Sequence, residues 1–179
     1  MNAPSPARRR CPALSIAQPW AWAILHCGKR IENRDRWTGC RYRGEVWLHA
    51  SKGTGTLAEF HQAIVAIDGL QVADVRRVAM PGRRRPHSGP LQELWIPRGD
   101  LDRGGIVGRA RIVDVIENEP TFAAWAQRSA VGEQQRVWWQ GGFALVLADV
   151  RAVPFTPCVG ALGLFAVPQE IESQIVVAD

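Results

Sequence analysis

Three charged residues with complementary chemistry lie close together in the chain: Lys29, Glu32 and Arg34. Lys29 follows Gly28, which is well placed to end a helix, so the lysine ammonium can project away from that helix. Glu32 and Arg34 are two positions apart and would share one face of a strand. Two cationic donors and a carboxylate acceptor suit the edge of a nucleobase better than a bare phosphate. A structural salt bridge that fixes a helix-to-strand connection is the competing interpretation.

Two tryptophans precede this cluster. Trp20 and Trp22 lie two positions apart in an expected helix, so they cannot share a helix face. We expect one to pack in the core and Trp20 to stack on a base, an interaction worth about 1–3 kcal/mol. We expect most of the eight tryptophans in the chain to pack in the hydrophobic core. Gln18, just before Pro19 and Trp20, is included as a further ligand-binding residue.

His49 and Ser51 are two positions apart on an expected strand and would share a face. A serine beside a histidine suggests a nucleophile, but no Asp or Glu at suitable spacing orients the histidine. We therefore expect both residues to form hydrogen bonds with a ligand, with His49 lining the same cleft as Lys29, Glu32 and Arg34. The candidate phosphate contacts, which would set affinity without reading sequence, are Arg41, Arg43 and Lys52.

Positive charge is concentrated in the first third of the chain. The net charge is +5, and residues 1–60 contain ten Lys and Arg against four Asp and Glu. Residues 121–179 contain three against five. A face built from the first third would suit a polyanionic partner. A solvated arginine-rich surface without a ligand is the alternative.

The four cysteines are scattered, with no C-x-x-C pair and no histidine at zinc-finger spacing. We therefore expect free thiols in a reducing compartment, and neither a metal nor a cofactor. No stretch approaches the roughly 18 apolar residues that span a bilayer. The sequence predicts a cytoplasmic protein that does not associate with membranes.

The elements that must position these residues are predicted from local patterns. In chain order, we expect strands or extended chain at 13–17, 29–35, 45–51, 105–116, 143–153 and 162–167, and helices at 20–27, 56–67 and 120–127. Within 45–51, Val46, Leu48 and Ala50 would face one way and Trp47 and His49 the other. Short strands punctuated by Gly and Pro, with two or three flanking helices, indicate a small β-barrel of the α+β class.

The composition predicts one domain. We expect a flexible leader at 1–12, a single domain at 13–168 and a C-terminal tail at 169–179. Within the domain, the stretch at about 70–103 is rich in Arg, Pro and Gly, and we expect it to form a flexible surface insertion. Its arginines could contact phosphates or remain solvated.

These segments together resemble the ASCH domain family, named for homology to an activating signal cointegrator. Residues 28–34 (GKRIENR) carry Gly, Lys, Glu and Arg in the order of the family's central motif. The other matching segments are 14–22 (LSIAQPWAW), 42–44 (YRG), 47–52 (WLHASK), 104–108 (GGIVG) and 141–147 (GGFALVL). The resemblance covers about residues 13–168, apart from the insertion.

The resemblance implies a PUA-like barrel with a cleft beside its helices, related to domains that bind RNA or read modified bases. RNA or a modified nucleoside is the implied partner, DNA is an alternative, and the oligomeric state stays open. Some relatives have been assigned hydrolysis of acylated cytidine or cleavage of RNA, and fold-level kinship does not choose among these activities.

Two enzymatic alternatives therefore accompany the binding hypothesis. An amidohydrolase acting on an N4-acylated cytidine would use Lys29 as general base, with Glu32 positioning or shuttling protons. The cytidine-acting relatives have a nucleophilic threonine where this chain has Glu32, so Ser51 or water would substitute. A metal-free ribonuclease would use Lys29 and His49 to stabilise charge and move protons. A protein-interaction domain using the insertion is the non-catalytic alternative, and we rank nucleic-acid or nucleobase binding first.

Overall fold

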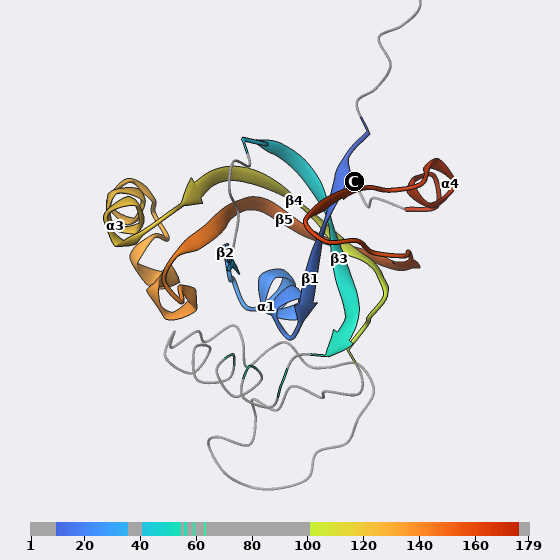
Figure 1. Ribbon diagram of the computed structural model, residues 1–179, viewed down its shortest axis with the longest axis horizontal. Coiled ribbons are helices and arrows are strands. Elements are labelled where there is room, and N and C mark those ends of the chain that lie inside the picture. Colours follow the sequence, from blue (N-terminus) through green and yellow to red (C-terminus); the bar gives the residue numbers. More distant parts are fainter. Residues whose placement is uncertain are drawn as a thin grey trace, which may run out of the picture.

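Six strands form one curled sheet in the order β2-β5-β4-β3-β1-β6. The computed structural model describes residues 10–35, 41–54, 56, 59, 63 and 101–175. The strands are β1 (Pro12–Gln18), β2 (Ile31–Arg34), β3 (Gly44–Thr54), β4 (Gly105–Ile116), β5 (Phe143–Pro157) and β6 (Leu164–Ala166). β1 and β3 are parallel, and every other neighbouring pair is antiparallel. The result is a mixed sheet that curls into a half-barrel around helix α1 (Trp20–His26) (Figure 1).

The concave side of the sheet holds the main core. Alternate residues of β1 and β3 point inward, with Leu14 opposite Leu48 and Ile16 opposite Ala50. α1 fills the curl by packing Ala21 and Ile24 against them, and the core is completed by Val46, Val107, Ala110, Ile112, Leu145 and Leu147. Burying this apolar surface stabilises the curl by roughly 25 cal/mol per Å².

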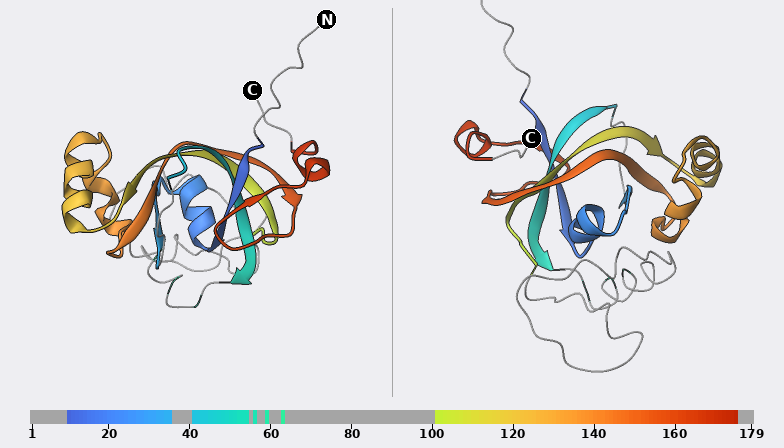
Figure 2. Two further views of the ribbon diagram at one scale, coloured as in Figure 1. Left: turned by 45° about the horizontal axis from the view of Figure 1, so that its top comes forward. Right: turned by 180° about the vertical axis from the view of Figure 1, so that it is seen from behind.

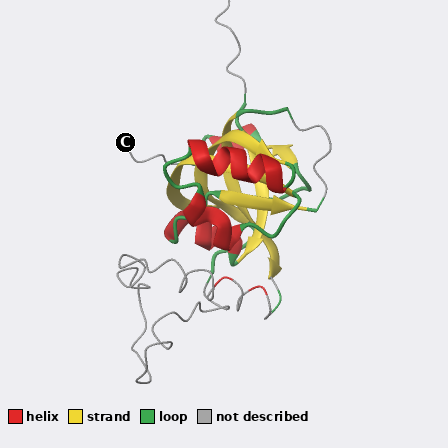
Figure 3. Cartoon of the chain, turned by 90° about the vertical axis from the view of Figure 1, so that its left-hand side faces the viewer, coloured by secondary structure: helices red, strands yellow, loops and turns green. Residues whose placement is uncertain are grey.

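The convex side is covered in two places by the other helices. α3 (Glu119–Arg128), followed by the 3-10 helix η2 (Glu133–Trp138), packs its Phe122 and Trp125 against Ile31 of β2. At the other end, β6 and the short helix α4 (Gln169–Glu172) lie over a cluster built from Ala13, Trp47, Ile106, Cys158, Val167 and Ile175. Two further views show these helices at opposite ends of the sheet (Figure 2), and Figure 3 shows a helix in front of the strands from one side.

Several local predictions are confirmed. β4 occupies 105–116 as predicted, and the inward alternation along β3 is present. α1 begins at Trp20 after Pro19, but it ends at His26 with Cys27 as its C-cap. Gly28 follows with a φ of 69°, the left-handed conformation that a helix-ending glycine adopts without a Cβ penalty. The prediction of an α+β fold is confirmed in outline, as an open half-barrel.

The end of β5 differs from the prediction. The apolar pattern predicts an end at Val153, just before Pro154, yet the strand continues to Pro157. β2 pairs only with the first four residues of β5, from Phe143 to Val146. Beyond that point one edge of β5 has no β2 neighbour, so a proline without an N–H is tolerated there.

Two other predictions fall largely outside the described residues. The helix at 56–67 is described only at Thr56, Glu59 and Ala63, and the insertion at about 70–103 only from Leu101 onward. Thr56 and Glu59 do form a capping box: the Thr56 N–H donates to Glu59 Oε2 at 2.6 Å, and the Glu59 N–H donates to Thr56 Oγ1 at 3.2 Å. The predicted tail contains the helix α4.

Candidate functional site

Lys29 lies in the short connection between α1 and β2. Its N–H donates to the Ala23 carbonyl at 3.3 Å, which folds the chain back under the helix after Gly28. The side chain therefore enters the interior, and Lys29 is only 1% exposed. A lysine buried to this extent requires partners for its charge.

The Lys29 ammonium has three partners. It donates to the Ile31 carbonyl and to Glu32 Oε2, the latter at 3.0 Å. It also lies 5.7 Å from the centroid of the Trp20 ring, a distance at which a cation is attracted to an aromatic face. Burial lowers the pKa of Lys29, and the neighbouring Glu32 carboxylate opposes this shift.

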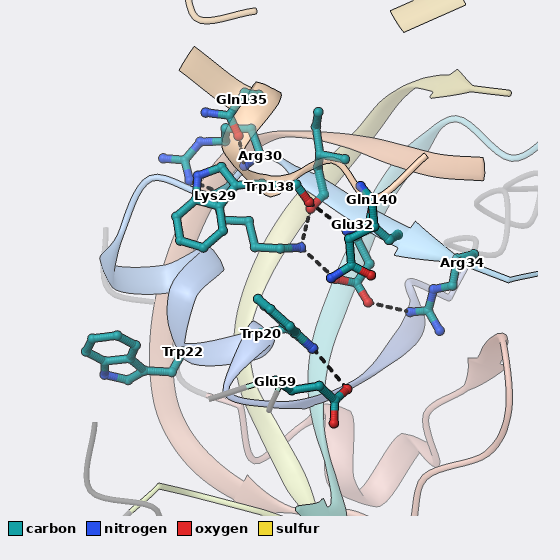
Figure 4. A network of polar contacts seen from close by, with 12 residues as sticks. Trp20, Trp22, Lys29, Arg30, Glu32, Arg34, Glu59, Gln135, Trp138 and Gln140 are labelled. Carbon is teal, nitrogen blue, oxygen red and sulfur yellow. Dashed lines mark hydrogen bonds and ion pairs between the residues drawn. The ribbon is translucent and has the colours of Figure 1, made fainter. Parts of the chain in front are cut away.

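Glu32 and Arg34 share the concave face of β2, as the strand alternation predicts. Arg34 Nη2 lies 3.3 Å from Glu32 Oε1 and donates to the Ser15 carbonyl at 2.8 Å. β6 pairs only with Pro12–Leu14, so Ser15 lies beyond the paired part of that edge of β1. The guanidinium therefore links β2 to β1 across the open side of the half-barrel, and the ion pairs form one continuous row (Figure 4).

Trp20 lies beside this row. Its Nε1 donates to Glu59 Oε1 at 3.4 Å, and the hydrogen bond from the Thr56 N–H is the main cause that lowers the pKa of Glu59. Trp20 is partly buried, and the Arg34 side chain is 20% exposed. Trp20 and Arg34 are thus more accessible than Lys29 and Glu32.

Trp22 and Gln18 have structural contacts. Trp22 points away from the cluster (Figure 4), and its ring lies 5.8 Å from that of His26. Gln18 is buried; its Nε2 donates to the Asp102 carbonyl at 2.9 Å, and its Oε1 accepts from the Trp22 N–H at 3.1 Å. The structure therefore places Gln18 at the junction of β1, α1 and the chain before β4.

His49 lies on the opposite face of the sheet from the cluster. Ser15 and His49 are register partners on the convex face, where Nδ1 of His49 is 3.1 Å from Ser15 Oγ. Its Nε2 is 3.0 Å from the Cys158 carbonyl, and its ring packs edge-on against Phe165. The expectation that His49 would share a cleft with Lys29 is corrected here, because strand alternation sends these side chains to different faces.

The remaining predicted residues are also dispersed. Ser51 follows His49 by two positions, on the face opposite Ala50 and the concave core, and its Oγ lies 3.5 Å from the Gly53 carbonyl. Arg41, Arg43 and Lys52 are exposed. Arg43 precedes β3 and Lys52 lies near its end, so nine strand positions, about 30 Å, separate them. They do not flank a single region.

A residue that sequence reasoning missed holds the connection around Lys29. Gln135 of η2 is buried; its Oε1 accepts from the Arg30 N–H at 2.6 Å, and its Nε2 donates to the Gly28 carbonyl at 3.0 Å. No local pattern indicates this contact, because Gln135 is more than a hundred positions from Lys29. The site therefore combines α1, β2 and η2.

The family model of the ASCH domain matches residues 14–151, a range that contains Trp20, the charged row and Gln135. No curated protein matches the chain. Within the described residues, no helix is long and apolar enough to cross a membrane.

Proposed function

Because the chain belongs to the ASCH domain family, a PUA-like family generally associated with RNA, we propose that it binds RNA and holds one nucleobase at the row formed by Lys29, Glu32 and Arg34. The observation that carries this proposal is the burial of that charged row beside an aromatic ring. DNA is the alternative nucleic acid.

The energetics of the row favour a ligand role. Removing an ammonium and a carboxylate from water costs several kcal/mol per ion, and well-packed apolar residues in their place are often as stable. The pair Lys29–Glu32 is therefore an inefficient means of holding β2 in place. Its chemistry suits a heterocycle with both donor and acceptor edges.

The exposure of the four residues suggests how a base would approach. Lys29 and Glu32 are 1% and 6% exposed, whereas Trp20 and Arg34 are more accessible. A base would stack on Trp20, contact Arg34 first and then reach the inner ammonium and carboxylate. Within the row, Lys29 and Arg34 carry one positive charge more than Glu32, while Glu59 beside Trp20 adds a second carboxylate at the edge of the site.

Fluorescence anisotropy with a labelled single-stranded RNA tests the proposal. We expect affinity to fall steeply as salt rises, because bound phosphates release counterions. We expect Lys29→Met to weaken binding by about 10- to 100-fold, since a hydrogen bond to a charged group contributes about 1.5–3 kcal/mol. Its unfolding free energy should fall only in part, because Glu32 loses Lys29 but keeps Arg34, and methionine keeps most of the volume.

Arg111→Ala is the matched control. Arg111 is exposed and ion-paired with Asp149 at 2.8 Å, outside the charged row. The change removes one positive charge, as Lys29→Met does, so equal effects of the two variants on binding would indicate a nonspecific charge effect. A flat salt response would contradict RNA as the partner.

The lowered pKa of Lys29 favours one enzymatic alternative. Burial shifts the pKa of Lys29 in the direction that a general base needs, and its ammonium lies 3.0 Å from Glu32 Oε2, which could take up a proton. An amidohydrolase acting on N4-acylated cytidine would use Lys29 in this role, with Glu32 orienting it. Incubation with N4-acetylcytidine and detection of released cytidine, with Lys29→Met as control, distinguishes this enzyme from a binding protein. No observation favours a ribonuclease that pairs Lys29 with His49.

A further inference from the structure

The side-chain amide of Gln135 bonds the chain on both sides of Lys29. Its Oε1 accepts from the N–H of Arg30, the residue after Lys29, at 2.6 Å. Its Nε2 donates to the carbonyl of Gly28, the residue before Lys29, at 3.0 Å. Gln135 is 3% exposed, and both ends of its amide are used within this one connection.

Arg30 completes the restraint from the other side. Its Nη1 donates to the Ile24 carbonyl of α1 and to the Lys29 carbonyl, each at 3.1 Å. The Arg30 carbonyl accepts from the Leu147 N–H of β5 at 2.8 Å. The backbone from Gly28 to Arg30 is therefore held by η2, α1 and β5 together.

We propose that Gln135 is the positioning residue for Lys29, and that η2 thereby belongs to the ligand site without touching the ligand. The inference rests on the proposed function, in which Lys29 contacts the base. Gly28 has a φ of 69° and gives this connection conformational freedom. The two bonds from Gln135 remove that freedom, so the ammonium is directed to Glu32 and beside Trp20.

The end of a flexible side chain can be held in one position only if the backbone that carries it is fixed. Lysine has four side-chain torsions and loses much rotamer freedom when it is held in one conformation. A misplacement of about 1 Å in a supporting group can reduce the activity of a site about 100-fold. Replacing Gln135 with leucine would leave the Gly28 carbonyl and the Arg30 N–H without their partner and loosen the connection, which would then be held only by its bonds to α1 and β5.

Amine labelling tests the inference directly, because the chain contains only two lysines, Lys29 and Lys52. Lys52 is exposed and serves as an internal reference. Acetylation with an amine-reactive ester, followed by mass spectrometry, should modify Lys52 quickly and Lys29 slowly in the parent protein. In Gln135→Leu we expect Lys29 to react at least about tenfold faster relative to Lys52, a factor that corresponds to about 1.4 kcal/mol.

Asn33→Leu is the matched control for η2. Asn33 Nδ2 donates to the Trp138 carbonyl at 2.8 Å, and Asn33 Oδ1 accepts from the Gln140 N–H at 3.1 Å. It is thus another amide that makes two backbone bonds, here at the end of η2 rather than beside Lys29. We expect Asn33→Leu to leave the Lys29 labelling rate unchanged. Equal acceleration in both variants would overturn the inference, since any loosening of η2 would then suffice.

RNA binding by Gln135→Leu, Lys29→Met and the double variant completes the test. We expect Gln135→Leu to weaken binding about tenfold on its own and to add nothing in the Lys29→Met background. The same loss in both backgrounds would overturn the inference and leave RNA binding intact. If the parent protein fails to bind RNA, the proposed function fails, while the labelling result still decides whether Gln135 positions Lys29.

Discussion

Two buried polar clusters lie on opposite faces of the same sheet and meet at Ser15. At the edge of β1, the Ser15 carbonyl accepts from Arg34, the end of the charged row on the concave side that starts at Lys29. On the convex face, the Ser15 hydroxyl lies 3.1 Å from Nδ1 of His49. The first cluster contains two cations and one carboxylate, whereas the second is built from neutral groups around one histidine.

The clusters differ in what their burial accomplishes. Each ring nitrogen of His49 has a partner, and a Cβ added to Gly160 would lie 2.3 Å from its ring. This arrangement fastens the end of β5 to β1 and β3 and leaves no room for a ligand beside the ring at Gly160. The charged row instead buries ionic groups, and their desolvation costs free energy. Apolar side chains could hold the same strands without this cost. Burial of a polar group therefore indicates function mainly where charge is retained.

The largest expected effect comes from breaking the charged row at its centre. Glu32→Leu removes the carboxylate shared by Lys29 and Arg34, and an uncompensated buried charge typically destabilises a protein by about 3–5 kcal/mol. Denaturant unfolding measures the loss. Adding Lys29→Met to Glu32→Leu should restore most of the stability, because the buried ammonium is then gone. If Glu32→Leu unfolds like the parent protein, the row is not a coupled ionic cluster.

Replacing the histidine of the neutral cluster should lower stability without affecting binding. His49→Leu removes the partners of the Ser15 hydroxyl and the Cys158 carbonyl, and each unsatisfied buried group costs about 1–3 kcal/mol. We expect a lower unfolding free energy and an unchanged affinity for RNA. A loss of affinity larger than the fraction of unfolded protein explains would show that the two faces are functionally coupled.

The pH dependence of stability should report on the neutral cluster around His49. Burial lowers the pKa of His49 below 6.5, its ordinary value, so the unfolded state binds the proton more tightly than the folded state. The contribution of His49 to stability is therefore complete above about pH 6.5 and is lost as the pH falls below that value. Urea unfolding at a series of pH values measures this slope, and His49→Gln should reduce it. An equal slope in parent and variant would mean that another group causes it.

The smallest effect is expected at the surface. Arg111 and Asp149 form an ion pair whose side chains are 51% and 62% exposed. Exposed pairs of this kind contribute about 0.2–1 kcal/mol at most, because water and salt screen them. Arg111→Ala should therefore change the unfolding free energy less than either buried replacement. A change as large as that of His49→Leu would remove the distinction between buried and exposed polar groups on which the comparison depends.

Several features could be predicted from sequence because they depend on local geometry. The limits of β4, the inward alternation along β3 and the common face of Glu32 and Arg34 all follow from the two-residue period of a strand. The left-handed Gly28 after α1 follows from the steric freedom of glycine. The matching segments in their order along the chain, with 28–34 among them, likewise indicated the family that the match over 14–151 confirms.

The tertiary structure alone decided which side chains meet. Sequence could place His49 and Ser51 on one strand face, but only the curl of the sheet determines that this face lies away from Lys29. The contact from Gln135 to the residues flanking Lys29 joins parts of the chain more than a hundred positions apart. The side-chain periods of strands and helices span two to four residues, so a short stretch of sequence is enough to recognise them. Sheet order and curvature depend on contacts across the whole domain.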